Sequence, residues 1–194
     1  AAEGKNKANS AWFWGAGTKP SLENFREKTG KSGAMISAVD LLKGIAVGSG
    51  MRVIDVPGAN GGLHTNYEGK AQAAIDALKT NDFVFLHVEA SDEAGHEGNI
   101  DLKVKTIEYL DSRIVKPIFE AVSTWDEPVT IAVLPDHPTP CAIKTHTNAP
   151  VPFIIYNPLQ AGDSVQVYNE DAAQQGIYGH IEENHFMKLL FDKK

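Results

Sequence analysis

The 194-residue sequence contains a single cysteine, Cys141, so no internal disulfide can form and a reducing compartment is expected. It lacks an apolar run near the roughly 18 residues that a membrane-spanning helix needs, and no signal peptide is recognisable at its start. Acidic residues outnumber basic ones, and the net charge of −7 argues against a nucleic-acid-binding surface. The sequence therefore predicts a cytoplasmic domain that binds neither membrane nor nucleic acid.

Apolar residues make up 42% of the chain, enough for one sizeable core. Residues 1–10 are small and polar and are predicted to be a linker or a frayed end, with residues 11–194 forming the folded part. Because the sequence does not begin with Met, a piece of a longer protein is expected.

Continuous apolar runs predict strands, and apolar residues recurring every three or four positions predict helices. The predicted strands are 11–14, 33–36, 51–56, 83–88, 129–135, 152–156 and a short one at Val165 and Val167. The predicted helices are 37–47 with Ser37 as N-cap, 67–78, 100–122 bent at Pro117, and 181–191, besides a partly helical segment at 21–29. This alternation predicts an α/β fold with a mostly parallel central sheet and helices on both faces.

A glycine-rich turn at 15–20 follows the first predicted strand. Such a turn can bring backbone N–H groups close to a phosphate, although many purely structural turns look the same. A phosphate also needs a cation nearby, and Lys19 in the turn and Lys43 in the helix after Ser37 are the candidates. Arg52, Arg113 and Lys144 are further available cations, and sequence position does not choose between them.

Two acidic, histidine-bearing clusters each follow a predicted buried strand. The first contains Asp92 and His96, whose four-residue spacing would place both on one face of a helical turn. The second begins with Asp136 and His137, and prolines at 138 and 140 stiffen the backbone there. Ligands of α/β proteins bind at the carboxyl ends of strands, and carboxylates with imidazoles suit a divalent metal. The alternative interpretation is a solvated loop whose carboxylates cap helices.

His146 follows the second cluster and has threonine neighbours that could orient its ring. His87 lies inside a predicted strand and is interpreted as a core residue, and Asp55 as a turn residue. His64, His180 and His185 have no acidic or strand-end neighbours that would mark them as ligands. Nitrogen and oxygen ligands without a thiolate favour manganese or magnesium over a structural zinc site, although zinc also fits.

Segments 37–45, 65–71, 89–98, 136–140 and 145–153 together resemble the archaeal-type cofactor-independent phosphoglycerate mutases, some of which carry the label of proposed homoserine kinases. The likeness extends over roughly residues 9–190. It implies an alkaline-phosphatase-like fold and two divalent ions, usually manganese. By motif, Asp92, His96 and His146 would bind one ion, and Asp136 and His137 the other. It also implies that 3-phosphoglycerate and 2-phosphoglycerate interconvert through a phosphoserine intermediate.

In that family a further Asp and the nucleophilic Ser precede the region matched here. Ser10, Ser21 and Ser37 lie in other segments, so no catalytic residue is nominated. The resemblance thus implies that residues 11–194 are the C-terminal part of the metal-binding, phosphatase-like domain, with an incomplete fold. The isolated chain is expected to lack mutase activity, and its exposed apolar edge to associate with itself or with the missing N-terminal part.

Two alternatives remain open at this level. A phosphatase or a small-molecule kinase would use the same metal ligands on a different phosphorylated substrate. A non-catalytic metal-binding domain would have no nucleophile anywhere in the protein.

Overall fold

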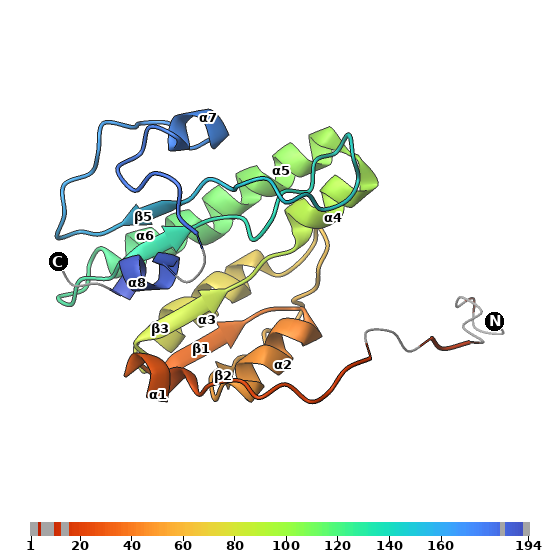
Figure 1. The fold of residues 1–194 in the computed structure, drawn as a ribbon, viewed down its shortest axis with the longest axis horizontal. Helices are drawn as coiled ribbons and strands as arrows, with labels where there is room; N and C mark the ends of the chain where they lie inside the picture. The colour runs from red at the N-terminus through yellow and green to blue at the C-terminus, as the bar shows by residue number, and fades with distance from the viewer. Residues whose placement is uncertain (1–3, 5–9, 13–15, 183–184, 192–194) are drawn as a thin grey trace.

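A parallel sheet of three short strands organises the first half of the chain in the computed structural model, which describes residues 4, 10–12, 16–182 and 185–191 (Figure 1). Its strands are β1 (Gly33–Ile36), β2 (Arg52–Val53) and β3 (Phe83–Leu86), in the order β2-β1-β3. Every residue of β1 is buried, as a central strand covered on both faces requires. The predicted parallel central sheet is confirmed.

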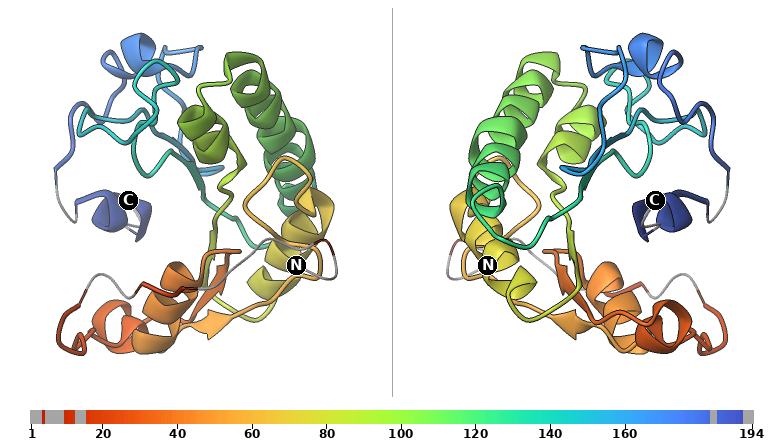
Figure 2. Two further views of the ribbon diagram at one scale, coloured as in Figure 1. Left: turned by 90° about the vertical axis from the view of Figure 1, so that its right-hand side faces the viewer. Right: turned by 90° about the vertical axis from the view of Figure 1, so that its left-hand side faces the viewer.

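Helices cover both faces of this sheet, as predicted. Figure 2 shows α2 (Asp40–Gly48) on one side and α3 (Tyr67–Leu78) on the other. The Asn66 side chain caps α3 by accepting the N–H of Gly69 at 2.9 Å. The prediction of Ser37 as N-cap of α2 is wrong, because its hydroxyl accepts the N–H of Val39 and closes a turn before the helix begins.

The long helix predicted at 100–122 is present but changes its winding midway. It consists of α5 (Ile100–Leu110), a π-helical turn η1 (Asp111–Val115) and α6 (Lys116–Val122). Pro117 has no N–H and its ring clashes with the preceding turn, so the regular α-helical hydrogen bonds are interrupted there. The helix has a wider π turn just before Pro117, where the Lys116 N–H donates to the carbonyl of Asp111, five residues earlier.

The main core cluster lies between α3, η1 and the end of β3. Its buried members are Tyr67, Ala71, Ala90 and Ile114. The small alanines on the inner face of α3 let that helix approach its neighbours closely, and the Tyr67 ring fills the space between them. This packing fixes the start of the next helix, α4 (Ala90–Glu97), just beyond the carboxyl end of β3.

The last two strands form a separate antiparallel pair rather than extending the parallel sheet. β4 (Ile131–Val133) pairs with β5 (Ile154–Tyr156). The pair packs against α6 through the rings of Phe119 and Tyr156, whose centroids lie 5.1 Å apart. In the described part of the chain, β3 pairs with β1 alone and β4 with β5 alone.

No strand forms at Val165 and Val167, so that prediction is wrong. The Tyr168 hydroxyl instead lies within hydrogen-bond distance of two carbonyls, those of Pro152 (3.1 Å) and Val133 (3.3 Å), and side-chain contacts hold this segment. Burial raises the pKa of Tyr168 to about 12. The segment continues into a short helix, α7 (Glu170–Ala173), that the pattern did not predict.

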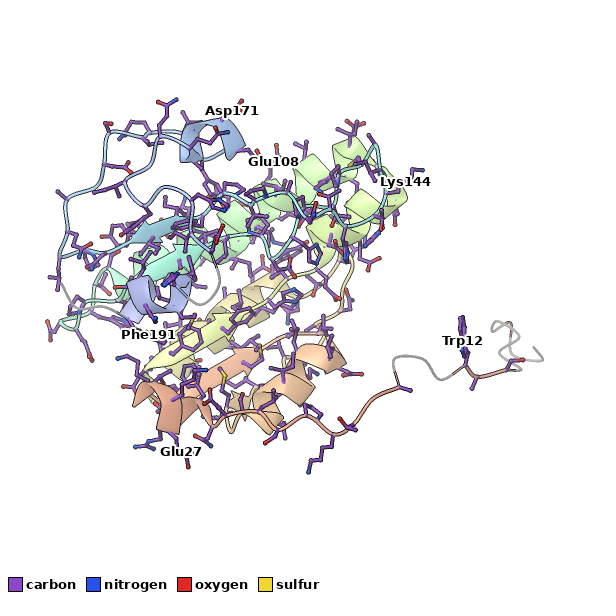
Figure 3. All side chains as sticks on the ribbon, in the orientation of Figure 1. Trp12, Glu27, Glu108, Lys144, Asp171 and Phe191 are labelled. Atoms are coloured by element: carbon purple, nitrogen blue, oxygen red, sulfur yellow. The ribbon has the colours of Figure 1, made fainter. Side chains whose placement is uncertain are left out.

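The two ends of the chain differ in how they meet the body. The predicted strand at 11–14 is absent at Ala11 and Trp12, and the rest of it lies outside the described residues. Trp12 is 88% exposed on a segment that leads away from the body (Figure 3). The closing helix α8 (His185–Phe191) packs Phe191 against Phe83 and against Phe25 of the short helix α1 (Phe25–Thr29).

Among the described residues, no helix has the length and apolarity to cross a membrane.

Candidate metal centre

Helix α4 carries the first predicted ligand pair at the carboxyl end of β3. Asp92 and His96 lie one turn apart, with His96 Nε2 3.3 Å from Asp92 Oδ2, so the predicted helical spacing is confirmed. The helix ends at Gly98, whose φ of +72° is a left-handed conformation that glycine adopts without strain. The carboxylate and imidazole therefore project from one rigid element.

His146 reaches the same point from the loop after β4. Its Nε2 lies 3.0 Å from Nε2 of His96 and 3.4 Å from Oδ1 of Asp92. Two ring nitrogens and one carboxylate thus face a common centre, although they come from segments about 50 residues apart. The turn at 140–144 makes this approach, because Lys144 N–H and Ile143 N–H both donate to the carbonyl of Pro140.

Lys144 fixes the orientation of the His96 ring through its backbone carbonyl. His96 Nδ1 lies 3.1 Å from this oxygen, which can only accept, so Nδ1 carries the proton and Nε2 presents a lone pair toward Asp92 and His146. Lys144 itself has φ of +60°, a strained value for a residue with a side chain. Figure 3 places Lys144 beside the end of α4. Such strain persists only where the surrounding contacts hold it.

The second predicted pair lies against the first. His137 Nε2 is 3.3 Å from Asp136 Oδ2, and its ring lies against that of His146, tilted by 32° with centroids 3.8 Å apart. The ligand atoms of Asp92, His137 and His146 all lie within 4.8 Å of one another. All five residues named from the sequence therefore gather in one cluster.

Thr139 connects the loop after β4 to helices α4 and α5. Its hydroxyl donates to Asp92 Oδ1 at 2.5 Å, and its carbonyl accepts the ammonium group of Lys103 at 2.6 Å. A side chain at Gly95 would place Cβ only 2.4 Å from that same carbonyl. Helix α4 can therefore approach the 139 loop this closely only because position 95 has no Cβ.

A cavity of about 420 Å³ adjoins the Asp136–His137 side of the cluster. Asn148 and His180 contribute polar groups to its wall, and Phe153 and Phe186 contribute apolar ones. His180, which had no recognisable context in the sequence, thus lines the cavity beside the cluster, and its Nε2 lies 3.7 Å from Glu182 Oε1. His185, in contrast, begins α8 and contacts the carbonyl of Glu182.

Sequence reasoning missed two residues beside the cluster. His87 and Ser37 contact each other, with His87 Nδ1 3.3 Å from Ser37 Oγ, and His87 Nε2 lies 3.7 Å from Asp136 Oδ2. The interpretation of His87 as a core residue agrees with its low exposure of 16%, but it did not foresee the contact with Asp136. Both residues directly follow a strand of the parallel sheet, and that position was the signal that could have found them.

The two candidate phosphate-binding cations, Lys43 and Lys19, have no contact with the cluster among the described residues. Lys43 pairs with Asp55 at 2.7 Å, and this hydrogen bond raises the pKa of the Lys43 ammonium group. Lys19 is exposed on the coil that runs outward toward the N-terminus, so the structure does not bring it to the cluster (Figure 1). Arg113 has other partners, because its guanidinium group donates to both carboxylate oxygens of Glu68 and lies over the Tyr67 ring.

The sequence profile of the Metalloenzyme superfamily matches residues 4–193. The chain belongs to this superfamily. Its 2,3-bisphosphoglycerate-independent phosphoglycerate mutase relatives include a Methanosarcina barkeri protein, 56% identical over 99% of this chain and 48% of its own length. A Methanocaldococcus jannaschii relative of the same name is 40% identical over 92% of the chain and 43% of its own length. The chain thus spans about half the length of the curated relatives it matches.

Solved structures agree with this assignment. A Pyrococcus horikoshii protein superimposes with a TM-score of 0.80 at 34% identity, over 88% of this chain and 51% of that protein. A cofactor-independent phosphoglycerate mutase from Thermoplasma acidophilum gives 0.62 at 28% identity, over 81% of this chain and 35% of the other. These likenesses confirm the family resemblance and the predicted fold of this superfamily member.

The side chains present fit the divalent metal that a metalloenzyme implies. The donor set is carboxylate and imidazole throughout, and Cys141 lies outside it. The Nε2 lone pair of His96 already points inward because its Nδ1–H is bound to a carbonyl, the usual arrangement of a ligating histidine.

Proposed function

We propose that this chain supplies the metal centre of a 2,3-bisphosphoglycerate-independent phosphoglycerate mutase, which interconverts 3-phosphoglycerate and 2-phosphoglycerate. One observation carries the proposal: the five motif residues converge on one cluster in a chain 56% identical to a relative of that name. The proposed substrates are phosphorylated three-carbon acids of glycolysis, so the proposed location is the cytoplasm.

In this proposal, Asp92, His96 and His146 hold one divalent ion, and Asp136 and His137 hold a second. Manganese is the preferred ion, with magnesium and zinc as alternatives. Bound there, the ions would stabilise negative charge on the transferring phosphoryl group and activate the attacking hydroxyl.

Residues of this chain orient the proposed ligand side chains through hydrogen bonds. The Thr139 hydroxyl holds one oxygen of Asp92, and the Lys144 carbonyl holds the ring of His96. Because the ligand side chains are already oriented, less conformational entropy is lost when the ion binds. Lys43 is proposed as a phosphate contact, whereas Lys19, which the structure does not bring to the cluster, is not.

The nucleophilic serine of the phosphoserine intermediate is proposed to lie in a part of the protein outside this chain. The 48% coverage of the Methanosarcina barkeri relative supports this division. The serine would take the phosphoryl group from 3-phosphoglycerate and return it to the 2-hydroxyl of the retained glycerate. The 194 residues alone are therefore expected to be inactive.

Phosphorus NMR of 3-phosphoglycerate, with the longer protein that contains this chain, tests the proposal. The reaction contains manganese and no 2,3-bisphosphoglycerate, and a parallel sample contains a chelator. Formation of 2-phosphoglycerate that stops with the chelator is the expected result. Release of inorganic phosphate would instead identify a phosphatase, and no conversion would refute the mutase proposal.

A further inference from the structure

A chain of three polar side chains joins the ends of three strands beneath the cluster. Ser37 follows β1, His87 follows β3, and Asp136 follows β4 after a short extension. Only Asp136 is among the family ligands considered above, so the contacts of the other two need an explanation of their own.

The Ser37 hydroxyl is placed to donate to one nitrogen of the His87 ring. The serine is 4% exposed, and one lone pair of its oxygen already accepts the N–H of Val39 at 3.0 Å. Its hydroxyl proton is free to point at His87 Nδ1, 3.3 Å away, and no other hydrogen bond is recorded for that hydroxyl in the described part of the chain. An Nδ1 that accepts this proton leaves the imidazole hydrogen on Nε2.

Asp136 favours the same arrangement from the other end. Its Oδ2 lies 3.7 Å from His87 Nε2, an electrostatic contact slightly longer than a hydrogen bond. A carboxylate can only accept, so a protonated Nε2 is attracted to it and a bare Nε2 lone pair is repelled. The backbone of His87 is held as well, because its N–H donates to the carbonyl of Ile36 at 2.8 Å.

We propose that His87, held by Ser37, is a positioning residue that orients the Asp136 carboxylate through an Nε2–H group. The Asp136 side chain is 59% exposed, and its Oδ1 accepts only the adjacent His137 N–H among the hydrogen bonds recorded for the described residues. The same Oδ2 lies 3.3 Å from His137 Nε2, and the contact to the partly buried His87 adds a restraint from the sheet on this exposed carboxylate. This inference rests on the proposed function for the use of Asp136, but not for the arrangement itself.

The same three residue types also make a nucleophilic triad, and the geometry argues against that use here. The Ser37 oxygen is buried, and its approach is blocked by the Val39 N–H that it accepts. An activated serine must instead be reachable by substrate, next to the base that takes its proton.

The first test uses the metal-free 194-residue chain and does not depend on metal binding or mutase activity. Long-range ¹H–¹⁵N correlation of the histidine rings, at mildly alkaline pH where free imidazole is neutral, reports the tautomer of each ring. The expected spectrum shows His87 as the Nε2–H tautomer, and in Ser37→Ala a shift toward a mixture. An Nδ1–H tautomer, or an averaged one, in the unmutated chain would overturn the proposal.

The second test separates positioning from packing by manganese titration, followed by electron paramagnetic resonance. His87→Ala is expected to weaken manganese binding about tenfold, the usual effect of losing an outer partner of a ligand. His87→Gln keeps an N–H donor near the place of Nε2 and is expected to restore most of this loss. Equal weakening in both variants, or none in His87→Ala, would overturn the proposal. A wild-type chain that binds no manganese would refute the proposed function, and the tautomer would then decide this inference alone.

Discussion

At the scale of single residues, Asp92 is where helix α4 contacts the segment between β4 and β5. Its carboxylate faces His96, His146 and the hydroxyl of Thr139. Asp92→Asn should weaken manganese binding about 100-fold or more, because loss of even an outer partner costs about 10- to 100-fold. Isothermal titration calorimetry of the 194-residue chain measures this.

Glu93→Gln is the matched control for Asp92→Asn. Glu93 is the next residue of the same helix, carries the same charge and is exposed. Its replacement should leave manganese affinity close to that of the wild type. If both substitutions weaken binding equally, the effect is general electrostatics and Asp92 is not a ligand.

Lys70 is a buried lysine in α3 with no hydrogen-bond partner for its Nζ among the described residues. Burial lowers the pKa of its ammonium group, and the charge of Glu89 partly opposes this shift. Lys70→Met should therefore raise the free energy of unfolding at neutral pH by about 1–3 kcal/mol, the cost of an unsatisfied buried polar group. Urea denaturation measures the difference.

The stability that Lys70→Met gains over the wild type should decrease as the pH rises. Below the lowered folded-state pKa of Lys70, both states carry the proton and the folded state bears the full desolvation penalty. Above it, the unfolded state binds more protons, so wild-type stability rises with pH up to the unfolded pKa near about 10.4. The advantage of Lys70→Met in the free energy of unfolding should thus shrink in alkaline solution.

A Lys70→Met variant less stable than wild type at neutral pH would show that Lys70 has a stabilising partner. Lys79→Met, at an exposed position, is the control.

The candidate ligand residues could be predicted from the sequence, whereas the groups that orient them could not. The four-residue spacing indicated Asp92 and His96, and the position after an apolar run indicated Asp136 and His137. The carbonyl of Lys144 and the hydroxyl of Thr139 act through backbone geometry and contacts across about 47 residues. No local pattern encodes such contacts.

At the scale of elements, the approach of α4 to the 139 loop depends on Gly95. Gly95→Ala would place Cβ 2.4 Å from the Thr139 carbonyl, so the helix and the loop must separate. We expect a destabilisation of about 1–3 kcal/mol from this overpacking, together with weaker manganese binding, because Asp92 and His137 move apart. Thermal unfolding and manganese titration measure the two effects.

Gly44→Ala provides the comparison for Gly95→Ala. Gly44 lies inside α2, and a Cβ there would meet nothing within 4 Å. The added alanine should stabilise the helix by about 0.5–1 kcal/mol and leave manganese binding unchanged. A Gly95→Ala protein that behaves like Gly44→Ala would disprove the close-approach argument.

Helices were predicted more accurately than strands, for a physical reason. Periodicity located α3 and the 100–122 helix closely, because an amphipathic face repeats over several turns. The bounds of β1 were predicted correctly, but the other strands were predicted too long, since an apolar run does not show where the hydrogen bonds between strands end. The π turn before Pro117 was read only as a bend, because a missing N–H shows that a helix is disturbed but not how.

At the scale of the whole molecule, the sequence was sufficient to predict the α/β class and the residues that cluster, but not the division into two sheets. The antiparallel pairing of β4 with β5 depends on the path of residues 134–153, which has no periodic pattern. The parallel strands were predictable because helices separate them in the chain and each reads as a buried run.

Strand edges and exposed apolar side chains predict self-association of the 194-residue chain. In the described residues, β3 pairs on one edge only, and Phe85 at its centre is 39% exposed. Sedimentation velocity should show the mean mass rising with protein concentration, since such edges pair with other chains. Phe85→Lys should reduce this rise by placing a charge on the edge. A monomer at every concentration would show that the edge is protected.

The central claim is that Asp92, His96, His146, Asp136 and His137 form a divalent-metal centre in this chain. Crystals grown with manganese, measured on both sides of the manganese absorption edge, test it most directly. The account predicts an anomalous peak within coordination distance of Asp92, His96 and His146, with a second beside Asp136 and His137 when the second ion is bound. A peak located elsewhere, or no peak at saturating manganese, would contradict it.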